Sequence, residues 1–102
     1  MTPPARKAYF ARPAEGEFRV IRKHYADEAK DIAEAFHAEV TRAVAFIERF
    51  PEAAPISIGN LRRKTLRKPF DTLFYAIEPD RIRIAAVAHH RREPSYFIPH
   101  AT

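Results

Sequence analysis

Cysteine is absent from this 102-residue chain, and glycine occurs only twice. The lack of cysteine excludes a thiolate nucleophile, a Cys-ligated zinc site and a disulfide framework, and it fits a reducing cytoplasm. With only Gly16 and Gly59, the chain has no Gly-rich loop that could cradle the phosphates of a nucleotide. No apolar run approaches the roughly 20 residues needed to span a bilayer, and the first residues lack the apolar core of a secretory signal. We therefore expect no cofactor, no membrane partner and a cytoplasmic protein.

The composition is that of one ordinary globular domain. Apolar residues make up 46% of the chain and charged residues 30%, which is a balance that folds without disulfides. A chain of this length has no material for a second core, so we expect a single domain over residues 1–102. One site or surface must then carry the function.

The positive charge is concentrated in the second part of the chain. Residues 1–60 hold nine Lys/Arg against nine acids, whereas residues 61–102 hold nine Lys/Arg against four acids. The whole net charge of +5 therefore lies in the C-terminal 42 residues. Such a patch attracts a polyanion or an acidic protein partner, although a solvated basic face has the same composition.

The N-terminal half predicts a strand followed by two helices. Residues 8–11 are short and aromatic and stop before Pro13, which suits the first position of a helix. A second helix is predicted from Asp27, which can cap it, to Pro51, which ends it. The apolar positions with helical spacing are Phe18, Ile21 and Tyr25 in the first helix, and Ile32, Phe36, Val40, Val44 and Ile47 in the second.

The C-terminal half predicts strands. Residues 51–60 are expected to form a crossing loop that ends at a Gly59-Asn60 turn, and a hairpin turn is expected at 78–80. Strands are expected at 61–66, 72–77 and 81–88, the last with Ile82, Ile84, Ala86 and Ala88 on one face. The predicted fold is α+β with the order β-α-α-β-β-β. A helical hairpin packs on one face of a mainly antiparallel four-stranded sheet, and the other face is left free for a ligand.

This order and the C-terminal motifs resemble the RelE/ParE superfamily of toxins. The similar segments are Leu61-Arg62-Arg63, residues 70–75 (Phe-Asp-Thr-Leu-Phe-Tyr) and residues 86–97, which contain His89-His90-Arg91-Arg92-Glu93-Pro94-Ser95-Tyr96-Phe97. The resemblance covers about residues 9–97. It implies the toxin of a type II toxin–antitoxin system, of the plasmid-stabilisation or stress-response kind. A cognate antitoxin would neutralise it in a hetero-oligomer by laying an acidic segment over the basic half of the toxin.

The resemblance leaves two targets open. In the RelE-like branch the toxin is a ribosome-dependent endoribonuclease that cleaves mRNA. There Arg91 would stabilise phosphate charge, Tyr96 or His89 would transfer protons, and Arg63 or Lys64 would assist from the facing strand. Thr72 stands where nuclease members carry an Arg, so this catalytic set is incomplete.

In the ParE-like branch the toxin poisons DNA gyrase and blocks replication without hydrolytic chemistry, which is the alternative that we favour. The same basic residues then form a docking surface, because Arg and aromatic side chains dominate interface energetics. The target-binding residues would be Arg62, Arg63, Lys64, Arg91, Arg92, Tyr96 and Phe97. A third alternative is a non-toxic binding module that keeps the fold. No metal site is expected, because the spacing of the histidines does not suggest one.

Overall fold

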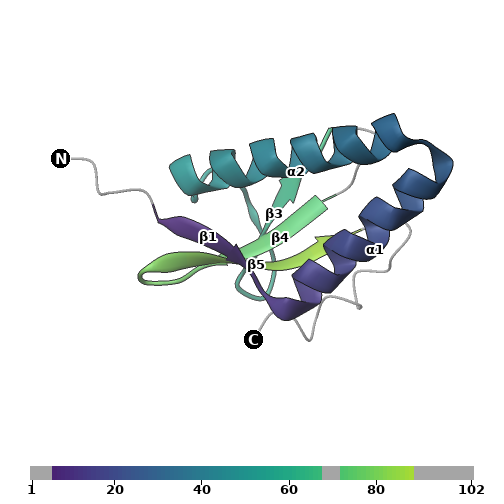
Figure 1. Ribbon diagram of the computed structural model, residues 1–102. Coiled ribbons are helices and arrows are strands. Elements are labelled where there is room, and N and C mark those ends of the chain that lie inside the picture. Colours follow the sequence, from purple (N-terminus) through teal and green to yellow (C-terminus); the bar gives the residue numbers. More distant parts are fainter. Residues whose placement is uncertain (1–5, 68–71, 89–102) are drawn as a thin grey trace.

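The two predicted helices form a hairpin that covers one face of the sheet (Figure 1). The structure is a computed structural model that describes residues 6–67 and 72–88. Helix α1 spans Arg12–Glu28 and helix α2 spans Lys30–Arg49. Pro13 lies in the first turn of α1, where its missing N–H leaves no helical hydrogen bond unmade. Ala29 alone separates the helices in an extended conformation, and the two helices form the predicted helical hairpin.

The predicted cap of the second helix is wrong. Asp27 lies inside α1, where its Oδ2 atom pairs with Lys23 Nζ at 3.4 Å. Helix α2 begins after Ala29 without a side-chain cap. Ion pairs between residues four apart, of which Lys23–Asp27 is one, favour the continuation of α1 to Glu28.

The sheet has five strands, where four were predicted. Their bounds are β1 Lys7–Phe10, β2 Ile56–Ile58, β3 Leu61–Thr65, β4 Thr72–Ile77 and β5 Arg81–Ala88. The order is β1-β5-β4-β3-β2, with β1 parallel to β5 and all other neighbours antiparallel. The extra strand, β2, lies within the predicted crossing loop. It pairs with β3 through a Gly59-Asn60 turn, and the φ of 55° at Gly59 is a conformation that glycine adopts without steric cost.

A bulge in β5 changes the predicted facing of its side chains. Phe74 pairs with Ala86 and Tyr75 pairs with Ile84, so Ala85 is an extra residue in the strand. The alternation shifts there: Ile82, Ile84 and Val87 belong to the core under the helices, whereas Ala85, Ala86 and Ala88 belong to a second buried cluster with Phe74. The expected common face of Ile84 and Ala86 is therefore wrong. The second face of the sheet is not free, because it holds this buried apolar cluster.

Aromatic rings of the helices and of β1 pack against one another. Phe18 of α1 lies edge-on to Phe10 of β1, with ring centroids 6.0 Å apart, and stacks on Phe36 of α2 at 5.4 Å. Tyr25 contacts the same Phe36 ring at 5.4 Å. The apolar positions predicted from helical spacing therefore meet in one core.

Three glutamates on the helices accept backbone N–H groups of the sheet or of its strand ends. Glu17 Oε1 accepts Val87 N at 2.9 Å, Glu48 Oε2 accepts Ala8 N at 2.7 Å and Glu39 Oε2 accepts Arg67 N at 2.6 Å. Because β1 pairs with β5 only as far as Ile84, Glu17 supplies an acceptor beyond the end of β1. Glu17 and Glu39 are themselves buried, so these bonds are shielded from water.

Tyr75 and Arg62 hold the loop that follows α2. The Tyr75 hydroxyl donates to the carbonyl oxygen of Pro51 at 2.6 Å, and Arg62 Nη1 donates to the carbonyl oxygens of Ala54 at 2.7 Å and Glu52 at 3.2 Å. Burial raises the pKa of Tyr75 above its ordinary value of 10.0, while the Arg62 cation and the backbone of Ala54 oppose the shift only in part. The folded state therefore favours the neutral phenol of Tyr75 over the phenolate.

Replacing Glu17 should destabilise the protein far more than replacing another glutamate of the same helix. Glu17→Ala leaves the Val87 N–H without this acceptor inside the protein, which costs about 1–3 kcal/mol in the free energy of unfolding. Glu28→Ala is the control, because Glu28 is exposed and pairs only weakly with His24, and its effect should stay within about 0.5 kcal/mol. Urea unfolding of both variants measures the difference. Equal stabilities would show that the Glu17 bond does not hold α1 to β5.

Tyr75→Phe should lower stability at neutral pH and change its dependence on alkaline pH. Loss of the hydroxyl removes the bond to Pro51, at a cost of about 1 kcal/mol. The contribution from the raised pKa is fully present below pH 10 and is lost as the pH rises further, because the unfolded chain ionises first. The free energy of unfolding, measured with urea between pH 8 and 11, should therefore fall less steeply with pH for Tyr75→Phe than for the wild type. The same pH dependence in Tyr75→Phe and the wild type would contradict this role of the Tyr75 hydroxyl.

Candidate functional site

The structure tests only part of the predicted site. His89, Arg91, Arg92, Tyr96 and Phe97 lie outside the described residues. The predicted site residues that the structure does describe are the three consecutive bases of β3, Arg62, Arg63 and Lys64.

These three bases do not form one patch, because neighbours in a strand point to opposite faces of a sheet. Arg62 pairs with Tyr75 and Lys64 pairs with Leu73, so both lie on the helix side. Arg63 pairs with Phe74 on the opposite face, where it is exposed. Arg62 uses its guanidinium to bind loop carbonyls, which gives it a structural role.

Lys64 belongs to a group of charges that sequence spacing did not reveal. Its Nζ lies 4.2 Å from the centre of the Phe46 ring of α2. Beside it, a cavity of about 210 Å³ is lined by Glu39 and Arg42 of α2 and by Arg67 after β3. Arg42 and Lys64 are 22 positions apart in the sequence, so only the packing of α2 over β3 brings them together.

On the face of the sheet opposite the helices, the described neighbours of Thr72 are mostly apolar. Thr72 pairs with Thr65 on one side and with Ala88 on the other. Its neighbours on this face are the buried side chains of Phe74, Ala86 and Ala88, and Arg63 is the nearest cation along β3 among the described residues. A nuclease site at this place would need several groups that transfer protons or bind phosphate.

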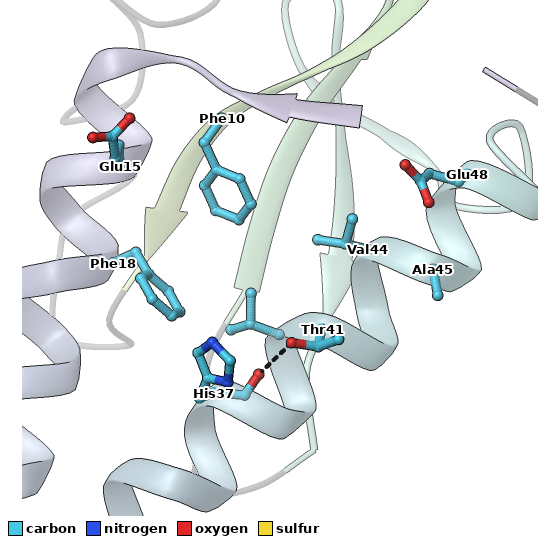
Figure 2. Close-up of a pocket in the computed structure, with 9 residues that line it drawn as sticks. Phe10, Glu15, Phe18, His37, Thr41, Val44, Ala45 and Glu48 are labelled. Carbon is cyan, nitrogen blue, oxygen red and sulfur yellow. Dashed lines mark hydrogen bonds between the residues drawn. The ribbon is translucent and has the colours of Figure 1, made fainter. Parts of the chain in front are cut away.

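A groove lies between β1, α1 and α2 (Figure 2). Its volume is about 510 Å³, and its lining is mostly apolar. Phe10 and Phe18 point into it from β1 and α1, and Val44 faces them from α2 (Figure 2). The complete lining is Phe10, Glu15, Phe18, His37, Val40, Thr41, Val44, Ala45 and Glu48.

Three of the polar side chains that line the groove are paired within the protein, and the His37 ring contacts Phe18 with centroids 5.7 Å apart. Glu15 and Glu48 stand at opposite ends of it (Figure 2), where Glu15 pairs with Arg19 at 2.7 Å and Glu48 accepts the backbone N–H of Ala8. The Thr41 hydroxyl donates to the His37 carbonyl at 2.9 Å. The apolar part of this groove is suited to bind apolar side chains of a partner.

No group of three or more His, Asp or Glu residues within 6–67 and 72–88 is placed to hold a metal ion. In the same ranges, neither helix combines the length and the apolar character that a membrane span requires.

Comparisons with known proteins identify the family. Residues 8–94 match the sequence profile of the family described as "ParE toxin of type II toxin-antitoxin system, parDE". A chain of the solved structure titled "Chromosomal ParDE TA system from P. aeruginosa" superposes with a TM-score of 0.72 at 17% identity, over 85% of this chain and 98% of that one, and so shares its fold. The search of curated proteins gave no match. Because the profile covers most of the sequence, the chain belongs to the ParE toxin family of type II toxin–antitoxin systems.

Proposed function

We propose that the chain binds DNA gyrase and blocks replication, and that a cognate antitoxin neutralises it by docking in the groove between β1, α1 and α2. Both events take place in the bacterial cytoplasm. The gyrase proposal is supported by the mostly apolar surroundings of Thr72, and the antitoxin proposal is supported by the apolar groove.

The chemistry of the residues around Thr72 counts against a nuclease site. Cleavage of RNA requires a proton acceptor, a proton donor and a cation around one phosphate. Around Thr72 the described residues offer hydroxyls, a phenyl ring and small apolar side chains, and Arg63 is the nearest cation on β3. Arg83 lies on the same face beside Ala76, but its guanidinium is paired with Glu78. An Arg at position 72 would add a phosphate ligand here, whereas Thr72 adds none.

The gyrase-binding surface would centre on Arg63 and on the C-terminal motif. Arg63 is exposed and has none of the loop contacts of Arg62. Arg91, Arg92, Tyr96 and Phe97 are the proposed further anchors, since Arg and aromatic residues are enriched among the side chains that dominate binding energy.

The antitoxin proposal follows from the chemistry of the groove. Its walls are phenyl rings and aliphatic side chains, and none of the described residues that line it is Lys or Arg. An acidic segment would therefore gain little there, whereas the apolar face of an amphipathic helix would be removed from water. A partner with apolar residues for the groove and acidic residues for Arg63 and the C-terminal bases would suit both surfaces.

The gyrase proposal is tested with purified components. The chain should cause DNA gyrase to accumulate cleaved DNA, and Arg91→Ala should reduce that activity by about tenfold or more, because truncating an anchor residue of an interface commonly costs at least 2 kcal/mol. Arg12→Ala is the control, since Arg12 is an exposed cation at the start of α1, far in sequence from the proposed surface.

The same preparations are tested for mRNA cleavage on translating ribosomes. Cleavage of mRNA without an effect on gyrase would contradict the proposal and establish the RelE-like alternative. Full activity of a folded Arg91→Ala variant would reject the proposed surface.

The antitoxin proposal is tested by adding bulk and charge to the groove. Ala45→Arg changes an exposed lining residue, so it should leave folding and growth inhibition intact while weakening antitoxin binding by about tenfold or more. Ala35→Arg is the matched control, because Ala35 is exposed on the same helix outside the groove. Titration calorimetry gives the affinities, and rescue of growth by the co-expressed antitoxin gives the effect in cells. Equal affinities of the two variants would place the antitoxin elsewhere.

A further inference from the structure

A second surface lies on the flank of α2 that faces β3, and the proposed function does not use it. There the carboxylate of Glu39 pairs with two arginines, Arg42 and Arg67. Its Oε1 atom lies 3.0 Å from Arg42 Nη2, and its Oε2 atom accepts the backbone N–H of Arg67 at 2.6 Å and lies 3.8 Å from Arg67 Nε. Lys64, over the Phe46 ring, completes the group, which we name the α2–β3 cluster: Glu39, Arg42, Phe46, Lys64 and Arg67.

The carboxylate of this cluster is fixed, while its arginines reach into solvent. The Glu39 side chain is only 11% exposed, whereas those of Arg42 and Arg67 are 56% and 71% exposed. Three cations surround one carboxylate, so the cluster carries a net charge of about +2 beside a cavity of about 210 Å³. Glu39 therefore holds the arginines in place without neutralising the cluster, which leaves donors for an external anion.

Exposed aromatic rings extend the cluster towards the end of α2. Phe46 is 37% exposed and Phe50 is 48% exposed, and their ring centroids lie 5.3 Å apart. The Arg49 guanidinium lies 5.4 Å from the centre of the Phe50 ring. Cations and rings thus alternate along one flank of α2, since residues 42, 46 and 49 or 50 are three to four positions apart.

We propose that the α2–β3 cluster and Phe50 bind single-stranded nucleic acid. A phosphate lies against Arg42, Lys64 and Arg67, and an adjacent base stacks on the exposed ring of Phe50. Proteins bind single strands with two kinds of side chain: cations that contact the phosphates, and aromatic rings that stack with the bases. An acidic peptide would satisfy the cations but would leave the Phe50 ring exposed, because a carboxylate side chain has no flat apolar face to place on it. The site lies on a different flank of α2 from the antitoxin groove and does not depend on the identity of the toxin's target.

The binding of a fluorescently labelled 12-nucleotide oligo(dT) to the purified chain, measured by anisotropy over a range of salt concentrations, tests this site. The wild-type affinity should fall with salt. Arg42→Gln and Lys64→Gln should each weaken binding and lower the slope of log K against log[salt] by about 0.7, which is one phosphate contact. Phe50→Leu keeps an apolar side chain but removes the ring, and should weaken binding by about fivefold or more, since one stacked base contributes about 1–3 kcal/mol.

Arg22→Gln is the matched control, because it removes the same charge from an exposed position on α1 and should retain the wild-type affinity and slope. Thermal unfolding establishes that each variant is folded. Equal weakening by Arg22→Gln and Arg42→Gln would overturn the proposal by showing that only the net charge matters. Displacement of the oligonucleotide by polyglutamate at equal charge concentration, or unchanged binding by Phe50→Leu, would overturn it in favour of an acidic protein partner. Failure of wild-type binding would also overturn it, and would leave the gyrase assay unaffected.

Discussion

The attachment of helices to sheet through three glutamate carboxylates determines the rest of the structure. Glu17 on α1 and Glu39 and Glu48 on α2 each accept a backbone N–H group where no neighbouring strand provides the acceptor. A carboxylate can do this at low cost because it makes a charge-assisted hydrogen bond with an N–H group that would otherwise be buried without a partner. The apolar core gives the hairpin its affinity for the sheet, and these bonds fix its position.

The position of α2 creates two surfaces of opposite chemistry on its two flanks. Towards β1 and α1, Glu48 fixes the edge strand and leaves an apolar groove of phenyl and aliphatic side chains. Towards β3, Glu39 holds Arg42 and Arg67 beside Lys64. An apolar element of a partner suits the first flank and an anion suits the second, so the proposed antitoxin and the proposed nucleic acid would occupy separate surfaces.

The sequence predicts the fold class, both helices, four of the strands and the family, because apolar spacing and proline positions reflect burial directly. It does not predict β2, since the three residues Ile56–Ile58 are too few to establish an alternating pattern. It does not predict the bulge at Ala85 either, since two adjacent alanines do not reveal which face each one occupies. The cluster around Glu39 was missed for another reason. Arg42 lies in the electrically neutral part of the chain, and only tertiary packing adds it to the bases of β3. The predicted alternation of β3 could have separated Arg63 from Arg62 and Lys64.

The central claim is that this member of the ParE toxin family stops replication and leaves translation intact. Pulse-labelling of DNA and protein synthesis in the minutes after induction of the chain in bacteria tests it most directly, because the two candidate targets stop different polymers first. The account predicts that DNA synthesis fails first and that a DNA-damage response follows. Protein synthesis failing first would contradict the account and identify a ribosome-dependent nuclease that functions with Thr72 in place of Arg.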